Sequence, residues 1–135
     1  MADAKEHTIS LLATTLAVDM NAAGGTEAAL FTVPAGKRLI VDHVMVYDFS
    51  ADAGNLVITL GKTGGDCDEF LGNQTFTASS PAFATEAFKL EVIPNATPVS
   101  RDVFTATQVF AVELTTAAGV VCTATFEVWG HLFDA

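Results

Sequence analysis

Basic residues are scarce in this sequence of 135 residues, where six Lys and Arg stand against 16 Asp and Glu and give a net charge of −10 at pH 7. The six are scattered along the chain, and Lys37-Arg38 is the single adjacent pair. Proteins that bind nucleic acid neutralise its phosphates with a basic stripe or patch. We therefore expect no direct contact with nucleic acid.

Long apolar runs and targeting segments are also missing. Half of the residues are hydrophobic (50%), yet no apolar run approaches the roughly 20 residues that a membrane-spanning helix needs. Residues 1–7 lack the basic stretch and apolar core of a secretory signal. We therefore expect a protein that is made in the cytoplasm and does not contact a membrane. Its acidic excess keeps so apolar a chain in solution.

Cysteine is rare, with Cys67 and Cys122 as the two in the chain. Neither belongs to a Cys-x-x-Cys pair that would indicate a zinc or redox site. Because no secretory signal precedes them, we expect two reduced thiols. Cys122 falls in a strand pattern and is expected in the core, whereas Cys67 falls in an acidic loop.

Catalytic motifs are absent as well. No Gly-x-Ser-x-Gly elbow occurs, and residues 61–63 (Gly-Lys-Thr) match only the end of a P-loop, because Leu56 stands where the first glycine is needed. His7, His43 and His131 lack the His-x-His spacing of a cupin metal site. We therefore expect no enzyme, no catalytic residue, no metal and no cofactor.

One acidic loop leaves a question open. Asp66, Asp68 and Glu69 could offer oxygen ligands to calcium, alone or with Asp48 and Asp52 from another loop. They do not follow the EF-hand spacing, and calcium needs about six or more converging oxygens. Solvated loop acids are the better interpretation, and whether the 66–69 loop binds a cation stays open.

What the sequence does contain is alternation of apolar and polar residues, which predicts β-strands. Turns rich in Gly, Pro and Asn separate the alternating stretches, and no long helical pattern occurs. The expected strands lie within residues 7–20, 28–33, 38–49, 56–60, 88–92, 110–114 and 120–128. The chain is therefore predicted to be all-β, an antiparallel β-sandwich of about eight strands, most favourably a jelly roll. An immunoglobulin-like sandwich stays open, although its Cys-Trp-Cys signature is missing.

The stretch 31–49 organises this pattern as a strand, a tight corner at residues 34–36 (Pro-Ala-Gly) and a long strand. Apolar residues alternate before Asp42 and after it, but in opposite phase (Leu39, Val41, Val44 and Val46). A β-bulge near Asp42 would place all four on one buried face, because one extra residue reverses the alternation.

We expect one domain over residues 1–135, with an N-terminal arm of about residues 1–10 and a C-terminal tail of about 130–135 that docks because it carries large apolar side chains. Residues 61–81 are the least regular stretch, and Ser80-Pro81 suggests the start of a short helix. Side chains near the termini and the isolated basic pair are the candidates for contact with a partner: Leu11, Leu12, Lys37, Arg38, Leu132 and Phe133.

The corner Phe-Thr-Val-Pro-Ala-Gly-Lys-Arg-Leu-Ile-Val (31–41), the Thr- and Ala-rich strands and the closing Phe-Glu-Val-Trp-Gly (126–130) resemble small jelly-roll decoration, or cement, proteins of tailed bacteriophages. The resemblance implies a non-enzymatic virion protein that binds the outer surface of an assembled capsid and bridges coat subunits. It further implies the major capsid protein as a partner and a homo-oligomer, a trimer or alternatively a dimer. No binding residue carries over by motif.

Two other classes stay open. A ligand- or carbohydrate-binding β-sandwich, of the kind associated with phage tails or adhesion, would need exposed aromatic side chains, and Trp129 and Tyr47 are the candidates. A cupin-like metalloenzyme would share the jelly roll but would need a bound metal.

Overall fold

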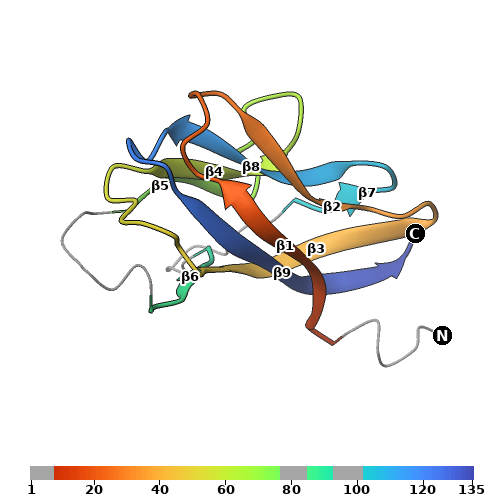
Figure 1. Ribbon diagram of the computed structural model, residues 1–135. Helices are drawn as coiled ribbons and strands as arrows, with labels where there is room; N and C mark the ends of the chain where they lie inside the picture. The colour runs from red at the N-terminus through yellow and green to blue at the C-terminus, as the bar shows by residue number, and fades with distance from the viewer. Residues whose placement is uncertain (1–7, 77–84, 93–101) are drawn as a thin grey trace, which may run out of the picture.

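The computed structural model describes residues 8–76, 85–92 and 102–135. Within these ranges the chain forms strands, turns and bends and no helix, so no helical segment that could cross a membrane is found there. Two antiparallel sheets pack face to face as two layers (Figure 1). The predicted all-β sandwich is confirmed.

The strands are β1 (Ser10–Asp19), β2 (Glu27–Thr32), β3 (Lys37–Tyr47), β4 (Val57–Lys62), β5 (Leu71–Thr75), β6 (Phe88–Leu90), β7 (Phe104–Thr105), β8 (Val109–Thr116) and β9 (Thr123–Asp134). Sheet A has the order β1-β9-β3-β6, and the short β7 also pairs with β3. Sheet B has the order β2-β8-β4-β5. With β7 set aside, each sheet interleaves early and late strands, which is the double Greek-key arrangement of a jelly roll. The turn after β8 steps from sheet B to sheet A.

The predicted β-bulge is present in β3. Val41 pairs with Gly130 and His43 with Trp129, so the register between β3 and β9 shifts at Asp42. The apolar residues on both sides of the bulge then share the inner face, each at most 1% exposed: Leu39, Val41, Val44 and Val46. One extra residue thus keeps an 11-residue strand buried on a single side.

The core lies between the sheets and is rich in phenylalanine. Phe49, Phe76 and Phe88 contact one another through tilted or edge-on rings, with centroids 5.4 to 5.8 Å apart. A second cluster is formed by Phe70, Phe110 and Phe104, again edge-on, which is the geometry that aromatic quadrupoles favour. Cys122 is fully buried, as predicted.

The C-terminal end differs from the expected tail, whereas the expected N-terminal arm is not tested. Residues 130–134 continue β9, which lies between β1 and β3, and are therefore part of a strand rather than a separate tail. A strand forms there because Leu132 packs against the core and pairs with Leu39. At the other end, β1 begins at Ser10, while residues 1–7 of the expected arm lie outside the described residues.

Two further expectations change. The irregular stretch 61–81 contains β5. The sequence Leu-Gly-Asn-Gln-Thr has poor strand propensity and did not predict this strand. The strand forms because it pairs with β4. Leu16, one of the apolar residues at alternate positions in the strand predicted within residues 7–20, is 73% exposed. A register shift between Thr15 and Val18, with Ala17 at φ +54°, turns it outward. The helix expected from Ser80 lies outside the described residues.

Candidate functional site

The six residues predicted to contact a partner all lie in sheet A. Leu11 and Leu12 belong to β1, Lys37 and Arg38 begin β3, and Leu132 and Phe133 end β9. The basic pair and the C-terminal pair come together, because Arg38 pairs with Phe133 and Lys37 with Asp134 in the β3–β9 register.

The six side chains differ in how accessible they are to a partner. Leu12 and Leu132 pack against the core, so they support the fold. Lys37 Nζ lies 2.6 Å from Asp134 Oδ1, and this ion pair neutralises the charge locally. Leu11 remains 44% exposed, and Arg38 is exposed. Leu11 and Arg38 are thus the candidates whose side chains remain most accessible.

Exposed apolar side chains occur just before and along β1, the edge strand of sheet A, and in the turn that leads into β9. Ile9 and Leu11 are 43% and 44% exposed, Leu16 is 73% exposed, and Val120 and Val121 are 46% and 86% exposed. The last two precede β9 beside the end of β1, where Met20 N donates to Cys122 O at 2.8 Å. We call these five residues the apolar edge. Edge strands of this kind are natural places for another chain to dock.

The outer face of sheet A carries a connected set of polar and aromatic side chains. The Trp129 ring stacks on His43 with centroids 5.7 Å apart. Glu127 joins two aromatic residues, because it accepts from Trp129 Nε1 at 3.3 Å and from the Tyr47 hydroxyl at 2.8 Å. His43 Nδ1 lies 2.7 Å from Asp42 Oδ2. The two aromatic residues considered for ligand binding therefore share one face, but one of them is already stacked.

Glu127 also determines the ionisation of Tyr47. The hydrogen bond to its carboxylate raises the pKa of the Tyr47 hydroxyl above the usual 10.0, and burial together with the negative charges of Glu127 and Asp48 adds to the shift. Tyr47 is therefore a neutral donor at physiological pH.

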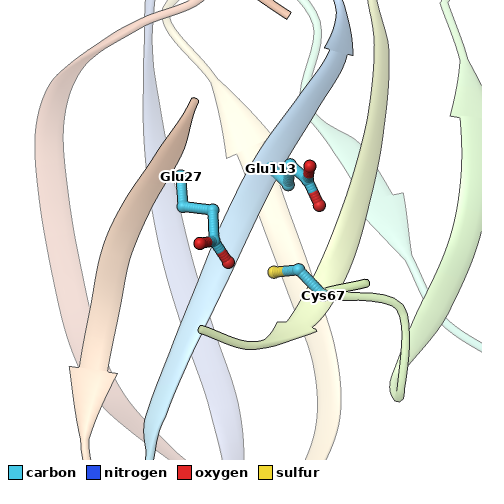
Figure 2. Close-up of side chains that lie close together, drawn as sticks. All are labelled: Glu27, Cys67 and Glu113. Carbon is cyan, nitrogen blue, oxygen red and sulfur yellow. The ribbon is translucent and has the colours of Figure 1, made fainter. Parts of the chain in front are cut away.

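Sheet B carries a different cluster on its outer side. The side chains of Glu27, Cys67 and Glu113 place one potential ligand atom each within 4.8 Å of one another. Figure 2 shows the Cys67 sulfur turned toward the Glu27 carboxylate, with the Glu113 carboxylate nearby. We call these three residues the acid–thiol cluster. Among the described residues, no other group of three or more His, Cys, Asp or Glu side chains has this proximity.

Three separate elements build the acid–thiol cluster. Glu27 begins β2 and is the direct cross-strand partner of Glu113 in β8. Cys67 comes from the connection between β4 and β5, which folds back over β4 so closely that a Cβ on Gly61 would lie 2.6 Å from Glu69 N and 2.7 Å from Asp68 N. The thiol is fully buried and donates to Ala111 O at 3.5 Å.

The surroundings of Cys67 suppress its reactivity. Burial raises the pKa of the thiol to about 12, and the negative charges of Glu27, Glu113 and Glu69 add to the effect. A nucleophilic cysteine needs the opposite environment, one that stabilises the thiolate. Cys67 is thus a protonated thiol at neutral pH and is unsuited to covalent catalysis.

The acids considered from the sequence do not form this cluster. Asp66 and Asp68 are exposed, and Glu69 Oε1 accepts a hydrogen bond from the backbone N of Lys62. The acid–thiol cluster was missed because its members are far apart in the sequence and only the β2–β8 register places Glu27 opposite Glu113. The histidines do not gather either, since His43 pairs with Trp129 and His131 with Ile40, while His7 lies outside the described residues.

Comparison with known proteins identifies the fold. No protein-family profile matches the sequence, and no curated protein matches it. A chain in the acidic stable capsid structure of Helicobacter pylori bacteriophage KHP30 is similar, with a TM-score of 0.53 and 14% identity over 95% of this chain and 92% of that chain. The two chains share a fold. A chain of the cyanophage Pam1 capsid asymmetric unit gives a TM-score of 0.49 at 14% identity, over 95% and 84% of the two chains.

Proposed function

We propose that this protein is a non-enzymatic structural protein of a phage virion, made in the host cytoplasm, which binds the major capsid protein on the outer surface of the shell and bridges coat subunits. The observation that supports this proposal is the likeness in fold to a chain of the KHP30 capsid structure over 95% of this chain and 92% of that chain.

The apolar edge is the surface that we assign to the capsid contact. It combines an edge strand with side chains as exposed as Leu16 and Val121, at 73% and 86%. Exposed apolar side chains on an edge strand are suited to contacts between proteins, and the core of such a contact is depleted in charged residues. Leu11, which the sequence predicted as a contact residue, belongs to this edge, and Arg38 lies in the same sheet.

The charge of the chain supports an outward position. A net charge of −10 would repel packaged nucleic acid if the protein lined the inside of a shell. On the outside of the shell, the acidic side chains would be hydrated by solvent. A homo-oligomer, a trimer or alternatively a dimer, would give the protein several such edges with which to bridge neighbouring subunits.

The proposal is tested by cosedimentation of the full-length protein with capsids of its virus, together with its native mass. We expect the wild-type protein to pellet with capsids and to be oligomeric. Leu16→Asp and Val121→Asp should weaken capsid binding by about tenfold or more, because each places a charge in an apolar contact. Val103→Asp is a matched control, since Val103 is 41% exposed but precedes β7, on the side of β3 away from β9. A monomer that does not pellet, or equal losses in all three variants, would contradict the proposal.

A carbohydrate-binding module is the second candidate. It is supported by the placement of Tyr47 and Trp129 on one face, joined through the Glu127 carboxylate. Glycan-array binding that Trp129→Ala abolishes would favour this candidate over the capsid role.

A further inference from the structure

We propose that the acid–thiol cluster binds a divalent cation of borderline softness, of the Zn²⁺ class, on the outer side of sheet B. Neither the fold likeness nor the virion role calls for such a site, and the proposal is independent of both. Its support lies in the placement of Glu27, Glu113 and Cys67 and in the buried oxygens around them.

The first argument is the pairing of two carboxylates. Glu27 and Glu113 are directly opposite across the β2–β8 pair, a position in which like charges are unfavourable. The ion pairs between described residues involve Lys37, His43, Lys62 and Lys89 with other acids, so none of them relieves this repulsion. A bound cation would turn the repulsion into attraction.

The second argument is the presence of buried oxygens without partners. Among the described residues, two buried side-chain atoms lack a hydrogen-bond partner, and they are Glu27 Oε2 and Thr59 Oγ1. Thr59 is 6% exposed and pairs with Glu113 in the β4–β8 register, so its side chain belongs to the same face as the cluster. Buried oxygens are normally satisfied, and both orphaned oxygens here stand beside one site. A bound cation would give Glu27 Oε2 the partner that it lacks.

The third argument is the chemistry of the donors. A thiolate with two carboxylates suits Zn²⁺, which takes sulfur and oxygen ligands in tetrahedral sites. Calcium and magnesium prefer oxygen alone and need about six ligands, more than this cluster offers. Three protein ligands leave a fourth position for water. Binding would replace the S–H bond of Cys67 with a sulfur–metal bond and release the thiol proton to solvent.

An ion bound at the acid–thiol cluster would stabilise the structure by linking the β4–β5 connection to sheet B. Cys67 belongs to the β4–β5 connection, whereas Glu27 and Glu113 belong to neighbouring strands of sheet B. A cation held by all three would fasten the connection to the sheet. Gly64 N, which lies 3.3 Å from Glu27 Oε1, already makes a weaker link of the same kind.

The test uses the full-length protein, stripped of metal under reducing conditions and titrated with Zn²⁺ by calorimetry and with Co²⁺ by absorption. We expect one ion per chain, a sulfur-to-cobalt charge-transfer band, and a rise in melting temperature with Zn²⁺. Cys67→Ser should abolish the band, and Glu113→Gln should weaken Zn²⁺ binding by at least about tenfold. Circular dichroism of the metal-free variants checks that each one folds.

Two control variants separate this site from other donors. Cys122→Ser removes the other buried thiol, and Asp66→Asn removes an exposed acid beside Cys67. Both should bind as the wild type does. The proposal is overturned if the wild type does not bind Zn²⁺, if the cobalt band is missing, or if Asp66→Asn lowers the affinity while Glu113→Gln leaves it unchanged.

Discussion

The outer faces of the two sheets are built in opposite ways. Sheet A leaves its outer side open, with half-buried Tyr47 and Trp129 on the face and Leu16 at the edge. Sheet B is covered in part by its own chain, because the β4–β5 connection lies close over β4 and its Cys67 contacts Ala111, and both residues are fully buried. On our proposals, the difference separates two tasks in one small sandwich: sheet A offers surface to partners, and sheet B holds a half-buried polar cluster.

The largest effect is expected where the covering connection meets sheet B. Gly61→Ala would place a Cβ 2.6 Å from Glu69 N and 2.7 Å from Asp68 N, so the connection must lift from β4. Overpacking of this kind typically costs about 1–3 kcal/mol of unfolding free energy. Urea denaturation followed by tryptophan fluorescence measures the loss.

Gly72→Ala is the matched control for Gly61→Ala. Gly72 also lies in a strand of sheet B, but a Cβ there would meet nothing within 4 Å. Its unfolding free energy should therefore change little. Equal losses in the two variants would mean that the connection does not cover the sheet as closely as the structure shows.

A smaller effect of opposite sign is expected at Thr59. In the metal-free protein its buried hydroxyl has no hydrogen-bond partner among the described residues, and a buried unpaired hydroxyl is costly. Thr59→Val removes that hydroxyl and should stabilise the metal-free protein by about 1 kcal/mol. The measurement is the denaturation midpoint.

Thr125→Val provides the comparison in sheet A. Thr125 is 5% exposed, but its oxygen is not among the orphaned buried atoms. We therefore expect Thr125→Val to stabilise less than Thr59→Val or to destabilise. The reverse order would show that the Thr59 hydroxyl is satisfied in solution.

The fold was predictable from sequence because its signals are local. Alternation of apolar residues and the change of phase at Asp42 are both readable within one strand, and the structure confirms the bulge there. The exposure of Leu16 could not be predicted from the sequence, because it depends on the positive φ of Ala17 and on the register with β9. The pattern in β1 alone fits either face.

The candidate sites were less predictable for the same physical reason. The grouping of Lys37 and Arg38 with Phe133 depends on pairing between segments nearly 100 residues apart, and the acid–thiol cluster depends on the β2–β8 register and a folded-back connection. Deleting residues 130–135 should destabilise the fold, since it removes the end of β9 and Leu132, which packs against the core. The strand order and register decide which residues lie close together across a sheet, and the alternation of residues along the sequence does not specify them.

The smallest expected effect tests the open face of sheet A through Tyr47, the only tyrosine in the chain. Its pKa is raised above 10.0 mainly by the hydrogen bond to Glu127, so the stability that this bond contributes is present below about pH 10 and is lost as the pH rises through the shifted value. Tyrosinate absorbance reports this single titration directly. Glu127→Gln should lower the pKa toward 10.0, whereas Glu113→Gln in sheet B should leave it unchanged. An unshifted wild-type titration would mean that the Tyr47–Glu127 bond is open in solution and that the outer face of sheet A is less ordered than its connected side chains indicate.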